Sequence, residues 1–227
     1  MLRAITFDCW GTLVDAFHST RPERITFLSR YLPGMDLERI EEAYDVSVTQ
    51  FTLVAEHGLN LSTATVLSLT LDSLGTTLPP DDLATILRQW EETVLYSPPP
   101  FLDGALEMLR AVRSRGLAVG LISDTGMTPG RVMRRMFFQL NLLPLFDWLT
   151  FSDQIGVTKR HVQPFASTCR ALSVHPSEAL HIGDLLETDI RGAHAAGMRA
   201  GLLLQNTNHR EGIPEADLVL ERWEELP

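Results

Sequence analysis

The feature of this sequence that most constrains its fold is a series of short apolar runs separated by segments with helical periodicity. The runs that are long enough to be buried strands cover residues 4–7, 117–122, 148–151, 180–182, 200–204 and 218–220. Short apolar runs that alternate with helices indicate a parallel sheet covered by helices on both faces. We therefore predict an open, mostly parallel three-layer α/β core, with ligands at the carboxyl ends of the strands.

A long helical insertion separates the first apolar run from the second. Four stretches have apolar residues at three-to-four spacing, and glycines and prolines separate them. They are RPERITFLSRYL, DLERIEEAYDVSVTQFTLVAEHG, LSTATVLSLTLDSLG and PPDDLATILRQWEETVLY. The following SPPPFLDG predicts a stiff linker, because consecutive prolines limit backbone freedom. The predicted fold class is a Rossmann-like α/β core of residues 1–15 and 98–227, with an inserted four-helix domain of residues 16–97.

The composition is that of an ordinary globular protein, with 44% hydrophobic and 21% charged residues. A net charge of -10 argues against non-specific binding to nucleic acid or an anionic membrane, so we expect a small-molecule partner. The two cysteines, Cys9 and Cys169, are too few for a disulfide framework, and no signal segment or long apolar stretch is visible. We expect a cytoplasmic protein that is a monomer or a homodimer.

Four stretches place reactive groups just after predicted strands. They are AITFDCWGTLVD with Asp8 and Thr12, LAVGLISDTG with Ser123, SDQIGVTK with Lys159, and LHIGDLLETDIRGAHAAGM with Asp184 and Asp189. Because the carboxyl ends of parallel strands meet at one edge of a sheet, we expect these side chains to share a cleft. The strand before Asp8 should then be central, between the strands that precede Ser123 and Asp184.

These residue types together favour phosphoryl transfer. Carboxylate oxygens such as those of Asp8 and Asp184 suit Mg²⁺, which also accepts a backbone carbonyl and keeps several waters. The Ser123 hydroxyl, the Lys159 ammonium and the backbone amides of residues 11–13 can balance the charge of a phosphoryl group. The histidines outside these stretches show no metal-binding spacing, so we expect surface or structural roles for His57, His175, His181, His194 and His209.

The motifs FDCWGTL, LISD, GVTK and GDLLETD occur in this order, each after a predicted strand. In this the chain resembles the haloacid dehalogenase superfamily over its whole length, including a helical cap between the first two motifs. A single DxxGT arises often by chance, whereas four ordered motifs are specific. The resemblance implies a hydrolase, and GDLLETD is the metal-binding form of the fourth motif, so we expect a Mg²⁺-dependent phosphatase of small phosphorylated metabolites.

The resemblance also implies roles for individual residues. Asp8 would be the nucleophile that forms an aspartyl intermediate. Thr12 and Ser123 would hydrogen-bond to the transferring group, and Lys159 would hold both Asp8 and that group by its charge. We also expect the substrate to contact residues near the nucleophile and after the second strand, namely Trp10, Gly11, Thr12, Ser123 and Asp124.

The metal site implied by the resemblance contains Asp8, the backbone carbonyl of Trp10, Asp184 and Asp189. Asp184 would ligate Mg²⁺ directly, whereas Asp189 would hold the metal shell or its waters. Asp189 also stands where it can cap the predicted helix DIRGAHAAGM.

Trp10 departs from the family pattern. Most phosphatases of the family carry a second aspartate there, which protonates the leaving alkoxide and then deprotonates the attacking water. The indole NH of Trp10 is a donor only and can do neither. Loss of such an acid typically costs ~10² to 10⁴ in rate. Asp15, His161 and residues of the cap are candidates to replace it, although Asp15 is better explained as a hinge or turn residue.

Two alternatives to a phosphatase follow from this departure. The 2-haloacid dehalogenases carry an aromatic residue at this position and work without metal, because a halide leaves without a proton. They hold halide and carboxylate with a cap arginine; Arg30 and Arg39 stand near that place in this sequence, and neither is assigned the role. A homologue that binds a ligand with little turnover is the other alternative. We favour the phosphatase, because Asp184 beside Asp8 would repel it unless a cation lay between them.

Overall fold

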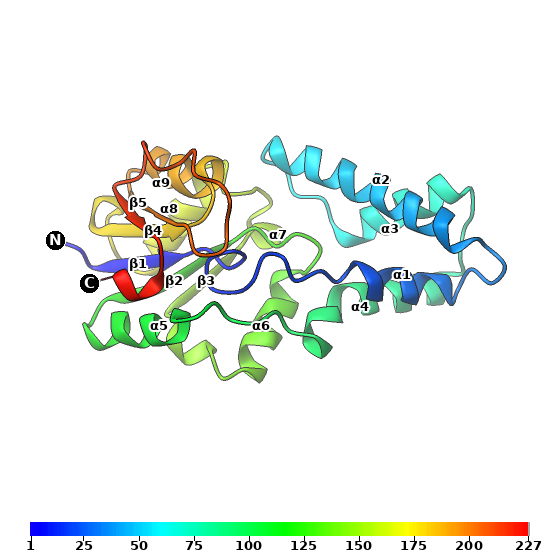
Figure 1. Cartoon of the computed structure of the whole chain (residues 1–227), viewed down its shortest axis with the longest axis horizontal. Coiled ribbons are helices and arrows are strands. Elements are labelled where there is room, and N and C mark those ends of the chain that lie inside the picture. Colours follow the sequence, from blue (N-terminus) through cyan, green and yellow to red (C-terminus); the bar gives the residue numbers. More distant parts are fainter. Residues whose placement is uncertain (227) are drawn as a thin grey trace.

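The computed structural model describes residues 1–226, in which six strands form one sheet and four helices extend beyond one of its edges (Figure 1). The strands are β1 (Ala4–Phe7), β2 (Ala118–Ser123), β3 (Trp148–Phe151), β4 (Ala179–Gly183), β5 (Arg199–Leu203) and β6 (Leu218–Leu220). Their order is β3-β2-β1-β4-β5-β6, and all neighbouring pairs are parallel. The predicted parallel α/β core is confirmed, and each predicted strand agrees with the observed one to within one residue at either end.

Helices cover both faces of this sheet. One face packs on α5 (Ala105–Ser114) and α6 (Gly130–Gln139), and the other on α8 (Gln163–Ala171) and α9 (Arg191–Ala195) (Figure 1). The remaining short elements are α7 (Ser152–Ile155), the 3₁₀ turns Leu143–Leu145, Pro176–Glu178 and Trp223–Glu225, and the π-helical turn Leu186–Ile190. Side chains alternate along β1, so that Ile5 and Phe7 join the first apolar cluster and Ala4 joins the second.

The position of β1 brings three strand ends together. Phe7 pairs with Leu121 of β2 on one side and with Ile182 of β4 on the other. The residues that follow, Asp8 and the ends of β2 and β4, therefore lie next to one another at the carboxyl edge. The prediction that the first strand is central is confirmed.

The four remaining helices form a bundle with an apolar core of its own. They are α1 (Arg21–Ser29), α2 (Leu37–Glu56), α3 (Thr63–Leu74) and α4 (Pro80–Tyr96). Asp36 and Ser62 cap α2 and α3 through hydrogen bonds to backbone NH groups, and Trp90 is fully buried among the four helices. The four helices lie where the sequence predicts them. Their assignment to a separate domain of residues 16–97 stays a prediction. No helix within residues 1–226 is long and apolar enough to span a membrane.

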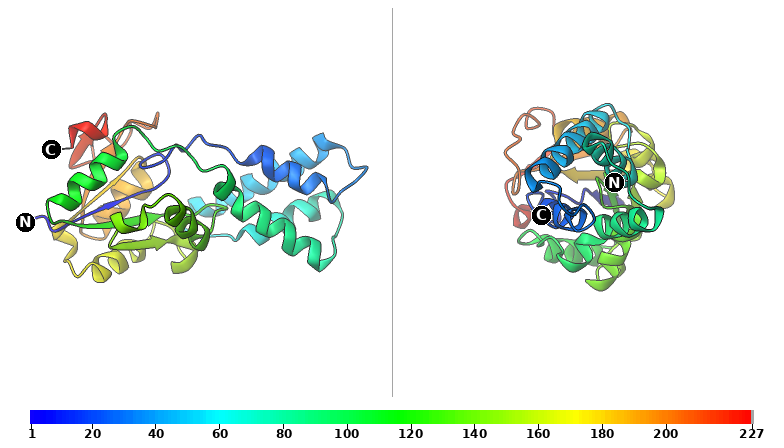
Figure 2. Two further views of the ribbon diagram at one scale, coloured as in Figure 1. Left: turned by 90° about the horizontal axis from the view of Figure 1, so that it is seen from below. Right: turned by 90° about the vertical axis from the view of Figure 1, so that its right-hand side faces the viewer.

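The bundle is joined to the sheet by two chain segments that run side by side (Figure 2). Val14 forms an antiparallel bridge with Phe101, and the Asp15 NH donates to the Pro100 carbonyl at 3.0 Å. The outgoing and the returning chain are thus paired where they leave the core.

Further contacts hold the bundle over the carboxyl edge of the sheet. Gly58, in the connection between α2 and α3, accepts at its carbonyl from the Thr158 NH at 3.0 Å, and Thr63, the first residue of α3, donates through its hydroxyl to the Met127 carbonyl at 3.1 Å. Two ion pairs, Glu91–Arg131 and Glu92–Arg135, join α4 to α6. The bundle therefore covers the strand ends that carry the reactive groups.

Candidate active site

The predicted reactive groups meet at the carboxyl edge of the sheet. Asp8 directly follows β1 and is 4% exposed. The Lys159 ammonium donates to Asp8 Oδ1 at 2.5 Å and to Asp189 Oδ1 at 2.5 Å. Asp184 follows β4, and Asp8, Asp184 and Asp189 each offer a carboxylate oxygen within 4.8 Å of the other two. The structure thus brings these four residues together in one buried cluster.

Acidic groups outnumber basic groups in this cluster. Burial raises the pKa of Asp8 to about 6, although Lys159 opposes the shift. Burial also raises the pKa of Asp184, to about 8, and the charges of Asp8 and Asp189 add to this effect. Burial works against the charge of Lys159, but Asp189 and Asp8 outweigh it and raise the lysine pKa. Three carboxyl groups therefore share one ammonium, so a further positive charge would stabilise the cluster.

The surroundings of Asp184 fit a hard divalent cation. Its Oδ1 is buried and has no hydrogen-bond partner among the described residues. Gly11 lies beside it with a φ of 79°, and a Cβ at this position would lie 2.5 Å from Asp184 Oδ2. The turn after Asp8 therefore requires glycine, both for its backbone conformation and for the close approach of the carboxylate. Carboxylate oxygens so placed are the ligands that Mg²⁺ prefers.

The turn after β1 also positions Thr12 and Trp10. The Thr12 hydroxyl donates to Asp8 Oδ2 at 3.4 Å, and the Thr12 carbonyl accepts from the indole NH of the buried Trp223 at 2.9 Å. Trp10 is half-buried and packs against the core. Its indole lines a cavity beside the cluster, at the sequence position where the resemblance implies a second aspartate in most phosphatases of the family.

Ser123 and Asp124 end β2 beside the nucleophile. Ser123 is 1% exposed, and its hydroxyl donates to the Asp124 carbonyl at 3.4 Å. Asp124 Oδ1 accepts from the backbone NH of Lys159 at 3.0 Å, and burial raises the pKa of Asp124. Asp124 therefore holds the loop that presents the lysine. It also lines the cavity next to Trp10, where the sequence predicted a substrate contact.

Asp189 does not cap a helix, so that interpretation of the sequence is wrong. It lies inside the π-helical turn Leu186–Ile190, and α9 begins after it with Ile190 as its N-cap. Its Oδ2 accepts from the Leu185 NH at 3.0 Å, while Oδ1 accepts from Lys159. The extra residue of the π turn directs this side chain back into the cluster, where Lys159 and His181 hold its pKa low despite burial.

His181 belongs to the site, and the sequence reasoning missed it. It is fully buried in β4, with Nε2 at 3.0 Å from Asp189 Oδ1 and Nδ1 at 2.9 Å from the Thr6 hydroxyl. Because the ionised Asp189 carboxylate can only accept, Nε2 carries the proton and Nδ1 accepts from Thr6. The available signal was a polar residue in the middle of an apolar run, which has to find partners when the strand is buried.

Other candidates lie outside the cluster. Asp15 Oδ1 accepts from the Phe17 NH at 2.9 Å, which is the contact of a turn residue. His161 packs on Gly58 of the bundle. Arg30 lies over the Phe27 ring, and Arg39 donates to the Leu74 carbonyl at 3.2 Å. Neither arginine lines the cavity beside Trp10, and the sequence assigned a substrate contact to neither of them.

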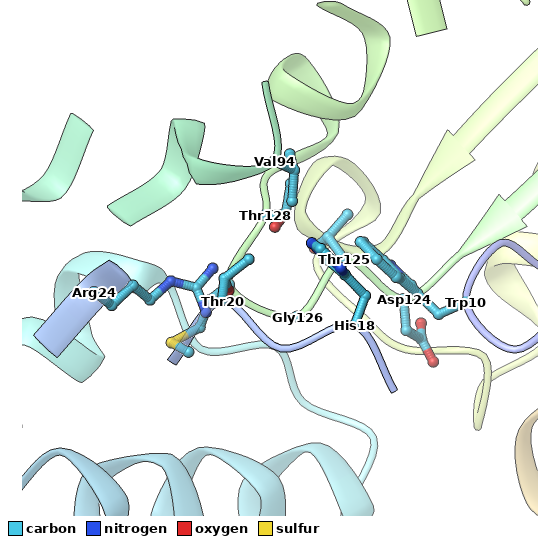
Figure 3. Close-up of a pocket in the computed structure, with 10 residues that line it drawn as sticks. Trp10, His18, Thr20, Arg24, Val94, Asp124, Thr125, Gly126 and Thr128 are labelled. Atoms are coloured by element: carbon cyan, nitrogen blue, oxygen red, sulfur yellow. The ribbon is translucent and has the colours of Figure 1, made fainter. Parts of the chain in front are cut away.

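A cavity of about 210 Å³ opens between the sheet and the bundle (Figure 3). Trp10 and Asp124 form its wall on the side of the nucleophile, and Arg24 and Thr20 of the bundle side face them. His18 lies between these walls, where its Nε2 is 2.9 Å from the Ser97 carbonyl. The cavity therefore adjoins the reactive cluster through Trp10 and Asp124, which lie next to Asp8 and Ser123 in the sequence.

A family model for haloacid dehalogenase-like hydrolases matches residues 2–197. Two curated phosphatases are similar over most of the chain. The N-acetylmuramic acid 6-phosphate phosphatase of Pseudomonas aeruginosa is 27% identical, over 99% of this chain and 93% of its own length. The glyceraldehyde 3-phosphate phosphatase of Methanopyrus kandleri is 26% identical, over 87% of this chain and 82% of its own length.

Solved structures agree in fold. A phosphatase from Thermococcus onnurineus gives a TM-score of 0.72 at 22% identity, covering 99% of this chain and 96% of its own. A 2-haloacid dehalogenase from Pseudomonas syringae pv. Tomato DC3000 gives 0.71 at 17% identity, covering 100% of this chain and 97% of its own. Phosphatases and dehalogenases thus share this architecture, so the fold alone does not separate the two activities.

Proposed function

The chain belongs to the haloacid dehalogenase-like hydrolases, and on this basis we propose that it is a Mg²⁺-dependent phosphatase of small phosphorylated metabolites. The observation that carries the proposal is the unpartnered Asp184 Oδ1 beside Asp8 and Lys159. Such a carboxylate next to a nucleophilic carboxylate is unfavourable by itself and favourable around a divalent cation. The two curated relatives described above are phosphatases, which supports the same activity.

Asp8, Asp184 and the backbone carbonyl of Trp10 would hold the metal ion, and Asp189 would support its shell. Bound there, Mg²⁺ would supply positive charge to the phosphoryl group and to Asp8. The oxygens of Asp189 already accept from Lys159, His181 and the Leu185 NH. This set of contacts suits a residue that orients its neighbours better than one that binds the ion directly.

The protein residues would perform the reaction in two displacements. An oxygen of Asp8 attacks phosphorus, an Asp8–phosphorus bond forms, and the bond to the leaving oxygen breaks. The hydroxyls of Thr12 and Ser123 would donate to the phosphoryl oxygens, while Lys159 balances their charge. A water oxygen then attacks phosphorus, the Asp8–phosphorus bond breaks with its electron pair returning to the Asp8 carboxylate, and phosphate leaves, while the proton lost by the water passes to solvent. Positioning and charge neutralisation supply most of the acceleration in such transfers.

Trp10 limits which substrates this mechanism serves. Because no carboxyl group at this position protonates the leaving oxygen, an alkoxide leaves slowly, whereas an aryl or acyl oxygen leaves without help. We therefore expect kcat/KM on aryl and acyl phosphates to exceed kcat/KM on alkyl phosphates by about 10² or more, because this constant reports on departure of the leaving group and not on the later hydrolysis that all substrates share. Equal kcat/KM for both classes would show that another group supplies the proton.

The helical bundle would act as the cap domain that selects the substrate. The proposed division is a core of residues 1–15 and 98–227 and a cap of residues 16–97. The contacts of Gly58 and Thr63 with the core place the connection between α2 and α3 over the strand ends. A cap in this position would exclude water during transfer, which is a common role of lids. A cytoplasmic location and a monomeric or homodimeric state stay predictions.

Metal-independent 2-haloacid dehalogenation is the second candidate, because Trp10 suits a leaving group that needs no proton. A protein that binds a phosphorylated ligand with little turnover is the third. A panel of phosphate esters and 2-chloropropionate, each assayed with Mg²⁺ and with chelator, separates these functions. We expect release of phosphate with Mg²⁺ only. Release of chloride in chelator would establish the dehalogenase, and no turnover of any compound would favour the binding protein.

A further inference from the structure

The cavity beside Trp10 contains a buried cation that the proposed chemistry does not use. Arg24 in the first turn of α1 is only 6% exposed and lines this cavity. Within residues 1–226, no carboxylate lies within 4.0 Å of its guanidinium, whereas Arg21, three residues earlier, pairs with Asp45 at 2.7 Å. Arginine is rarely this deeply buried without a charged partner, because removal of the charge from water is costly.

The backbone of α4 fixes the Arg24 side chain in place. Its Nε donates to the Trp90 carbonyl at 3.2 Å, and the Trp90 indole NH donates to the Arg24 carbonyl at 2.9 Å. Trp90 is fully buried and packs against Tyr44 with 5.4 Å between ring centroids. These reciprocal bonds hold the guanidinium stem, and Figure 3 shows the side chain directed from α1 toward Thr20 and the interior of the cavity. A binding group held in this way loses little entropy when a ligand arrives.

The other residues that line the cavity would repel an anion little, because they are mostly apolar or neutral. Val94, Met127 and Trp10 provide apolar surface, and Thr20 and Thr128 provide hydroxyl groups. The single carboxylate in the lining, that of Asp124, accepts from the backbone NH of Lys159. His18 donates through Nε2 to the Ser97 carbonyl, since a carbonyl can only accept. Arg24 is therefore the cation of this cavity, and an anion placed there would meet it in apolar surroundings.

We propose that this cavity is a subsite for a carboxylate on the leaving group of the substrate, and that Arg24 binds this carboxylate. The inference rests on the proposed phosphatase function and narrows its substrate class to phosphorylated compounds that carry a carboxylate. A guanidinium and a carboxylate match each other in planar geometry and balance one to one in charge. A second phosphate group would bring up to two negative charges to a single cation, which makes it the poorer match.

Two aryl phosphates of nearly equal shape test this subsite, 4-carboxyphenyl phosphate and 4-carbamoylphenyl phosphate. The carbamoyl group withdraws electrons more strongly, so leaving-group chemistry alone favours the amide. We expect the wild-type protein with Mg²⁺ to prefer the carboxylate by about 10- to 100-fold in kcat/KM, mainly through KM, as expected for a buried charge-assisted hydrogen bond. Both compounds are aryl phosphates, so the absence of an acid at Trp10 affects them alike.

The variant Arg24→Met should abolish this preference. It keeps the length of the side chain and removes its charge, so kcat/KM for the carboxylate should fall to that for the amide, with the amide little changed. Arg30→Met is the matched control, because Arg30 follows the same helix, is exposed and lies outside the cavity. Arg24→Lys should restore part of the preference.

A binding measurement needs no variant. The non-hydrolysable 4-carboxyphenylphosphonate should bind the wild-type protein with Mg²⁺ more tightly than its carbamoyl analogue, as measured by calorimetry. If both aryl phosphates are hydrolysed with equal kcat/KM, or a bisphosphate is preferred to both, the carboxylate subsite is wrong and the phosphatase stands. If neither is hydrolysed, the phosphatase fails, and the two phosphonates decide on the subsite independently.

Discussion

At the scale of single residues, Trp10 marks the strongest difference between this chain and the phosphatases it resembles. The variant Trp10→Asp would place a carboxyl group where a general acid stands in those phosphatases. We expect kcat/KM on alkyl phosphates to rise by about 10² or more, with little change in kcat/KM on aryl phosphates, whose leaving groups need no proton. Steady-state kinetics on both classes measures this. Trp10→Leu removes the ring without adding an acid, and an equal gain in that variant would attribute the effect to space instead.

Asp184 should make the stability of the metal-free protein depend on pH. Its pKa is raised from 3.8 to about 8 by burial and by the charges of Asp8 and Asp189. Between these values the folded state holds a proton that the unfolded chain releases, so stability falls as pH rises through this window. The fall is at most about 1.4 kcal/mol per pH unit for each such proton. In chelator, we expect the melting temperature to fall between about pH 5 and pH 8.

The variant Asp184→Asn should flatten this dependence, because it removes one of the protons involved. The raised pKa of Asp8, about 6, leaves a smaller fall in the lower part of the window. Saturating Mg²⁺ should also flatten the curve in the wild-type protein, since the ion competes with the proton. Asp72→Asn on the exposed side of α3 is the control and should leave the slope unchanged. A melting temperature in chelator that is independent of pH would contradict the assignment.

His181 offers a test of how Asp189 is held. In a substituted side chain at position 181, the amide nitrogen of glutamine can take the place of His181 Nε2. The amide nitrogen of the shorter asparagine can take only the place of Nδ1. His181→Gln therefore keeps the donor to Asp189, and His181→Asn loses it. Loss of such a supporting bond typically costs 10- to 100-fold in metal affinity or activity. We expect that loss in kcat/KM and in the Mg²⁺ concentration for half-maximal activity for asparagine, with glutamine near the wild type. Equal losses in both variants would indicate that the ring is needed only for packing.

The residues that sequence reasoning missed are those whose role depends on packing between elements. Asp8 and Asp184 could be predicted because each directly follows a strand of the parallel sheet, and Lys159 could be predicted from the motif GVTK, which comes after β3 and the short helix α7. His181 contacts Thr6 across two neighbouring strands, and this pairing leaves no local pattern. Arg24 was not considered, because helical periodicity shows which face of a helix is buried but not what that face covers.

At the scale of elements, the strands were predictable because each is a short, nearly uninterrupted apolar run. The helix predicted from Asp189 onward was wrong, because the chain first forms the π turn Leu186–Ile190 and the α-helix starts only at Arg191. The same spacing of apolar residues suits both, since Ile190 and Ala193 are buried in either case. A π turn is a local insertion, often found at functional sites, and here it directs a carboxylate toward Lys159.

The two ion pairs between α4 and α6 should stabilise the packing of the bundle against the core. The side chains of Glu91 and Glu92 are 12% and 13% exposed, whereas Arg131 and Arg135 are more than half exposed. Pairs that are open to water on one side contribute about 0 to 1 kcal/mol each. The double variant Glu91→Gln/Glu92→Gln should therefore speed hydrogen exchange in α1–α4 by several-fold and leave exchange in β1 unchanged. Faster exchange in β1 as well would indicate global destabilisation.

At the scale of the whole molecule, the site depends on pieces from both ends of the chain. β1 near the start is inserted between β2 and β4, so the nucleophile and the last carboxylates meet only when the complete sheet has formed. These contacts are far apart in sequence, which predicts slower folding than for a protein with mainly local contacts. The bundle, in contrast, is built from consecutive helices and has its own apolar cluster.

The paired segments at the base of the bundle have a consequence for how such a protein can change. Val14 and Phe101 lie side by side, and the Asp15 NH bonds to the Pro100 carbonyl. The chain therefore leaves the core and returns to it at neighbouring points, whatever the length of the segment inserted between them. We therefore expect that a different helical module can be grafted between these points without a shift in strand register or in the catalytic edge. If the bundle selects the substrate as proposed, such a graft would change the range of substrates and keep the residues that perform the reaction.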